Sequence, residues 1–179
     1  GAIPKPGRKL PVFYTLDPTQ DGERQVVLER VGDVQALIAV YHIPSGASPD
    51  SGAIAILEGV LGDAPSGRLE KALVDTKKAV SIGGYSMDLH DPGYLMFYAE
   101  VRMDQSIEEA RKTLLATVDA AAGASPMTAE EVERARGTIL KNYELTLNNA
   151  QRVGMLLSEY IGQGDWRLFY LHRDRVRAA

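Results

Sequence analysis

The sequence predicts an α+β fold in which helices pack on one face of a mainly antiparallel sheet. Runs rich in Val, Leu and Ile come in neighbouring pairs joined by turn residues, which favours antiparallel strands. Amphipathic stretches with helix-capping signals separate and follow these pairs, which favours helices gathered on the sheet. With 179 residues, of which 45% are hydrophobic, the chain is long enough to bury a core of its own.

The first elements are an arm and a hairpin. Residues 1–24 hold four prolines among polar residues and predict an extended linker arm from a preceding domain. Residues 25–179 are expected to form one domain. It opens with strands at Gln25–Val31 and Val34–Ile43, and the two residues between them signal a hairpin turn. Both faces of the second run are mainly apolar, so we expect a central strand that is covered on both sides.

Two helices and a second hairpin should follow. Residues 48–50 (Ser-Pro-Asp) start a helix whose body, Ala53–Leu61, is almost wholly apolar and should be buried. Ser66 can cap a second helix over residues 68–78.

The second hairpin is expected to join strands at Val80–Leu89 and Tyr94–Arg102. The pair Pro92-Gly93 between them suits a type II turn.

Helices are expected to complete the domain. Capping boxes at residues 106–109 and 128–131 each open a helix with one apolar stripe. Two more helices are expected at residues 149–161 and 166–176, and Asp165 caps the last one.

Composition excludes several classes of function. The net charge of -4 gives no basic footprint for nucleic acid. The absence of cysteine excludes disulfides, thiolate zinc sites and a Cys nucleophile. No apolar run reaches the roughly 18–20 residues that a membrane span needs.

Single residues and near-motifs do not assemble a catalytic or metal site. His42, His90 and His172 are far apart in the sequence, so neither H-E-x-x-H nor H-x-x-E-H occurs, and we expect structural or surface roles for all three. Residues 84–88 approach the nucleophile elbow G-x-S-x-G but lack its second glycine. We therefore expect no catalytic and no metal-binding residue in this chain.

The stretch Gly62–Leu69 has the glycine spacing of a phosphate-binding loop. That loop needs a Lys for the phosphates and a hydroxyl for Mg²⁺, and Arg68 and Leu69 stand in these places. The stretch is also expected to join two helices, whereas a phosphate loop follows a strand. We therefore interpret it as a helix–helix turn.

Longer phrases resemble a known family. The phrases "LEGVLGDAPSGRLEKALVDTKKA", "SMDLHDPGYLMFYAEVRMDQSIEEARKTLL", "TAEEVERARGTILKNYELTL" and "LSEYIGQGDWRLFYLHRDRV" look like the second, non-catalytic domain of a bacterial M16 zinc metallopeptidase. This is the family of insulinase, pitrilysin and the mitochondrial processing peptidase. The resemblance covers nearly the whole chain, and its most specific parts are Gly67-Arg68-Leu69 and the phrase Thr128–Ala135.

The resemblance carries expectations about architecture. Family members are built from related α+β units around a closed chamber. The first unit holds zinc with H-x-x-E-H and a distant Glu, and the last unit supplies an Arg and a Tyr that grip the substrate. The family domain normally continues past Ala179 with a final strand, which this chain does not show.

In the family, the substrate-binding Arg and Tyr lie in a phrase like S-R-L-x-x-x-L-R-E-x-x-G-L-A-Y. Aligned without gaps from Gly67-Arg68-Leu69, this phrase places its Arg on Val74 and its Tyr on Ser81. Both gripping residues are therefore missing, and the substrate-binding residues stay unknown. The chain resembles the supporting unit of such a protein.

The resemblance implies an accessory domain that walls the peptide chamber of an M16-type zinc protease. Zinc would belong to an upstream catalytic domain, which is also the expected partner along with a peptide substrate, and the chain alone should be inactive. The alternative is a domain of a catalytically inactive M16-like partner or scaffold subunit. The sequence does not give the compartment, and the periplasm is a guess from the bacterial resemblance.

Overall fold

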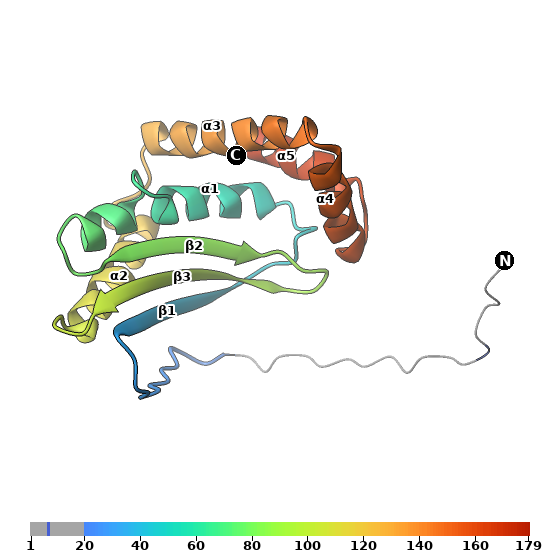
Figure 1. Ribbon diagram of the computed structural model, residues 1–179. Helices are drawn as coiled ribbons and strands as arrows, with labels where there is room; N and C mark the ends of the chain where they lie inside the picture. Colours follow the sequence, from blue (N-terminus) through green and yellow to red (C-terminus); the bar gives the residue numbers. More distant parts are fainter. Residues whose placement is uncertain (1–6, 8–19) are drawn as a thin grey trace. The chain divides into compact units, whose positions relative to one another are not determined.

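The computed structural model describes residue 7 and residues 20–179, and residues 32–179 form one compact unit (Figure 1). Its elements, in chain order, are β1 (Val34–Ile43), α1 (Ser51–Gly62), the short π-helix η1 (Glu70–Val74), β2 (Ser81–Met87), β3 (Gly93–Arg102), α2 (Ile107–Ala122), α3 (Ala129–Leu147), α4 (Ala150–Gly162) and α5 (Leu168–Ala178). The expected α+β class and antiparallel sheet are confirmed.

The sheet has three strands in the order β1-β3-β2, and both pairings are antiparallel. The central strand is therefore β3. The prediction that Val34–Ile43 is central is wrong, because β1 pairs only with β3 among the described residues and every second residue of it is exposed. Apolar residues on both faces of a strand therefore do not show that both faces are covered.

The main core lies between the sheet and the first helices. One face of β1 and β3 packs against α1, η1 and α2, with Leu61, Leu73, Phe97 and Leu114 fully buried. Side chains alternate between the two faces of a strand, so the residues between the buried ones point to the other side of the sheet.

A second core lies on the far side of α1. Ile56 and Val60 of α1 pack with Ala135 of α3 and Val176 of α5. At Gly52 a Cβ atom would lie 2.5 Å from the α5 backbone at Arg175, so only glycine permits this close approach of α1 and α5. As a result, α1 lies between the sheet and the outer helices, which explains its almost wholly apolar sequence (Figure 1).

The strand expected at Gln25–Val31 is absent from the structure. Residues 20–31, the described part of the linker and of this segment, contain no strand or helix. Apart from residue 7, the other residues assigned to the linker arm lie outside the described residues. Local β propensity does not suffice here, because a strand forms only where its backbone has a pairing partner.

Two local expectations also need correction. The helix expected over residues 68–78 ends at Val74, and Lys77 adopts a positive φ of 61°, which stops the helix. The prediction of a type II turn at Pro92-Gly93 is wrong, because Gly93 has no positive φ and is the first residue of β3. Glycine is required there for space, since a Cβ atom would lie 2.0 Å from the carbonyl oxygen of Met87.

Arg68 joins the start of the η1 segment to the start of α3. Its guanidinium donates to both carboxylate oxygens of Glu131, at 2.8 and 2.6 Å, and to the backbone carbonyls of Ser125 and Pro126. Glu131 also accepts from the backbone N–H of Thr128 at 2.9 Å and so completes the capping box of α3. The two side chains of the pair are largely buried, at 14% and 16% exposed.

We predict that Glu131→Gln lowers the free energy of unfolding by roughly 1–3 kcal/mol, because it leaves the Arg68 charge without its counter-charge in a largely buried place. Urea unfolding followed by circular dichroism measures this difference. The matched control is Glu130→Gln, the neighbouring exposed acid, which should stay within about 0.5 kcal/mol of the wild type. Equal effects of the two substitutions would contradict the assigned role of the pair.

The same pair predicts a pH dependence. The Arg68 guanidinium, helped by the hydrogen bonds from Thr128, lowers the pKa of Glu131 from 4.5 to about 2. Because this pKa is lower in the folded state than in the unfolded state, the ionised Glu131 stabilises the fold. The stabilisation is complete at pH values above the unfolded-state pKa near 4.5 and is lost as the pH falls toward 2. The stability difference between wild type and Glu131→Gln should therefore be constant from pH 7 to pH 5 and shrink steadily below that. A difference that persists at pH 2 would contradict the assignment.

Candidate functional site: the open face of the sheet

The sheet face opposite the helices carries uncovered apolar side chains. On β1, Val34, Ile38 and Val40 are 54%, 54% and 58% exposed. Leu37, Ala39 and Tyr41, on the other face of the strand, pack against the main core. We call the uncovered surface the open sheet face.

The open sheet face continues across all three strands in register. Val40 lies beside Met96 of β3, which lies beside Tyr85 of β2, itself 48% exposed. The neighbouring rows follow the same pairing. They are Ile38, Tyr98 and Gly83 on one side and His42, Tyr94 and Met87 on the other. The rows form one surface of aliphatic, thioether and aromatic groups.

Charge on this face is confined to its ends. Glu100 accepts a hydrogen bond from the Tyr98 hydroxyl at 3.1 Å, and this bond raises the pKa of Tyr98. Arg102 pairs with Asp104 just beyond β3. The middle of the face can therefore contact apolar and aromatic groups, but it offers no acid–base pair for catalysis.

The two outer edges of the sheet are also open. Within residues 32–179, β1 and β2 each pair with β3 alone, so the outer backbone groups of each have no strand partner. Such an edge can accept an extended peptide as an added strand.

Val74 and Ser81 align with the family's substrate-binding Arg and Tyr, and they lie at the end of η1 and at the start of β2. Val74 ends η1 and packs half-buried against the main core. Ser81 is the exposed first residue of β2. Neither side chain can supply the cationic or phenolic group of the family's substrate-binding Arg and Tyr.

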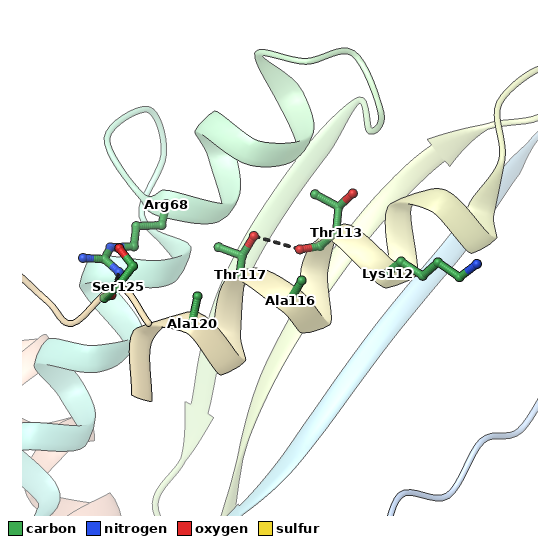
Figure 2. Close-up of a pocket in the computed structure, with 7 residues that line it drawn as sticks. All are labelled: Arg68, Lys112, Thr113, Ala116, Thr117, Ala120 and Ser125. Carbon is green, nitrogen blue, oxygen red and sulfur yellow. Dashed lines mark hydrogen bonds between the residues drawn. The ribbon is translucent and has the colours of Figure 1, made fainter. Parts of the chain in front are cut away.

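Arg68 is not free to bind a phosphate, because Glu131 and two carbonyls occupy its guanidinium. Beside it lies an open pocket of about 460 Å³ along α2 (Figure 2). Its floor is Thr113, Ala116, Thr117 and Ala120, and the Thr117 hydroxyl donates to the Thr113 carbonyl at 2.7 Å. The exposed Lys112 lies at one end of the pocket, within 3.9 Å of Glu108, and Ser125 lies at the other end beside Arg68.

The three histidines lie on different elements. His42 is near the end of β1, His90 follows β2 and contacts Asp91 at 3.3 Å, and His172 is on α5. Among the residues that the structure describes, no three His, Asp or Glu side chains are placed to hold a metal ion. Ser86 of the elbow-like stretch lies within β2 and not on a strand-to-helix turn.

Sequence reasoning missed a cluster of half-buried titratable groups between α1, β2 and α5. Burial raises the pKa of Glu58, and a hydrogen bond with Ser86 opposes the rise. Burial also raises the pKa of Asp88 and lowers that of His172, and their opposite charges counter each shift. The three residues come from distant parts of the chain, so no sequence spacing could reveal them. Each of them shifts in pKa mainly because of its burial.

These observations define an α+β domain with one sheet face covered by helices and one apolar face left open, an arrangement suited to contact with another protein surface. No helix in the described part of the chain is both long and apolar enough to cross a membrane. The model of the Peptidase M16 inactive domain matches residues 1–139. The chain belongs to this family and is a non-catalytic domain of the M16 type.

Solved structures agree with this assignment. The chain is 43% identical to the inactive peptidase domain of a "putative zinc protease" from Bordetella parapertussis, with a TM-score of 0.78, covering 86% of this chain and 84% of that one. A "putative zinc protease" from Bordetella pertussis is 41% identical, with a TM-score of 0.74, covering 82% of this chain and 83% of that one.

A longer relative is the zinc protease PqqE of Helicobacter pylori, which is 25% identical over 160 residues. The match covers 88% of this chain but only 36% of the Helicobacter protein. The chain thus spans about a third of that relative's length.

Proposed function

We propose that the chain is the accessory domain of an M16-type zinc protease and that its open sheet face forms one wall of the peptide chamber. The observation that carries the proposal is the continuous apolar surface over β1, β3 and β2, which lies opposite the helices in a domain of the inactive M16 type. An unfolded peptide exposes apolar side chains and unpaired backbone, and this face and its edges complement both.

Zinc belongs to the catalytic unit in this proposal. The residues described in this chain do not fit a zinc site, because they bring no three potential ligands together. When bound in the catalytic unit, zinc would polarise the scissile carbonyl and activate a water. This chain contributes binding surface, and on its own it should not hydrolyse peptides.

The proposal is tested by Ile38→Lys in the full-length parent protein. A charge in the middle of the open sheet face should raise KM for an unstructured apolar peptide about tenfold, while kcat changes little, because peptide contacts are lost without a change at the zinc. The assay is zinc-dependent cleavage of a fluorogenic peptide.

Leu145→Lys is the matched control. Leu145 is also 54% exposed, but it lies on α3 in the helical layer. An unchanged KM in Ile38→Lys, or an equal change in both variants, would overturn the chamber-wall role. A parent protein without zinc-dependent cleavage would instead favour the inactive partner subunit.

A further inference from the structure

The segment Gln25–Val31 has the composition of a strand but no partner for its side chains. Val26, Val27, Leu28 and Val31 are 82%, 71%, 77% and 108% exposed. Four large apolar side chains within six residues are costly to leave in water, because burying them would release the water that surrounds them. Such a segment is expected to be covered in the complete protein.

The backbone of this segment is also unpaired. Within the described part of the chain, no strand pairing or backbone hydrogen bond involves residues 25–31. An exposed run of β-branched residues with free N–H and C=O groups is a template for pairing with another strand.

The distribution of its side chains suits a strand with contacts on both sides. In an extended conformation Val27 and Val31 share one face, and Val26 and Leu28 share the other. Both faces carry apolar groups, with Glu29 between Val27 and Val31 on one face and Arg30 next to Leu28 on the other. A matching site would be a sheet edge with apolar side chains above and below it.

We propose that Gln25–Val31 docks as an added strand on an exposed sheet edge of the catalytic unit of the same protein. This inference rests on the proposed function, which places such a unit upstream. The match to PqqE leaves about two thirds of that protein's length outside the aligned region, which is room for a further sheet-containing unit. The segment immediately precedes the compact unit 32–179, so it is the part of the chain suited to bridge the two.

Hydrogen–deuterium exchange on the 179-residue chain and on the full-length parent tests the docking. The amides of residues 26–30 should exchange within seconds in the 179-residue chain. In the parent they should exchange at least about 100-fold more slowly, because added-strand hydrogen bonds protect them. Fast exchange in both proteins would overturn the inference. Protection already present in the 179-residue chain would also overturn it, since the segment would then pair with β1 or with a second copy.

Two proline variants of the parent sharpen the test. Leu28→Pro removes a backbone donor inside the segment and should abolish the protection of its neighbours, whereas Asp21→Pro, outside the segment, should leave it intact. The amides of β3 serve as the folding control and should stay protected in both variants. Loss of protection in both variants, or in neither, would contradict strand docking.

Peptide cleavage by the wild-type parent is recorded separately. An active parent without protection at residues 26–30 refutes the docking alone. A protected but inactive parent refutes the protease function alone.

Discussion

The arrangement of the helices depends on the ion pair between Arg68 and Glu131. The pair ties the chain after α1 to the first turn of α3, and Glu131 serves at once as the counter-charge of Arg68 and as the second half of the α3 capping box. Because α3 is fixed beside the end of α1, its apolar stripe covers the face of α1 that the sheet does not reach. The two most family-specific phrases of the sequence are thus the two ends of one contact.

The helices gather on one side of the sheet and leave the other face open. With α1, η1 and α2 on the sheet and α3 and α5 stacked on α1, the two cores recorded in the structure lie on the same side of β3. The opposite face keeps its valines, isoleucine and tyrosines in a register that spans all three strands. This open face and the two outer sheet edges are the surfaces that we propose bind peptide.

Sequence reasoning succeeded where the signal is local. The capping box at Thr128, the apolar stripes and the antiparallel hairpin of β2 and β3 depend on residues a few positions apart, and the structure contains them. It failed where distant segments decide the outcome. The edge position of β1, the unpaired Gln25–Val31 and the cluster of Glu58, Asp88 and His172 are set by which elements meet in space, and the spacing of residues along the chain does not encode that.

The most direct test of the chamber-wall role is photocrosslinking of a peptide substrate to the open sheet face. The photoreactive p-benzoylphenylalanine would replace Tyr85 in the full-length parent, with the similarly exposed Tyr170 on α5 as the comparison position, at 48% and 43% exposed. If the open sheet face lines the peptide chamber, a light-dependent adduct should form between position 85 and the peptide, and none should form from position 170. Adducts from position 170 alone, or from position 85 only to the protein's own chain, would contradict it.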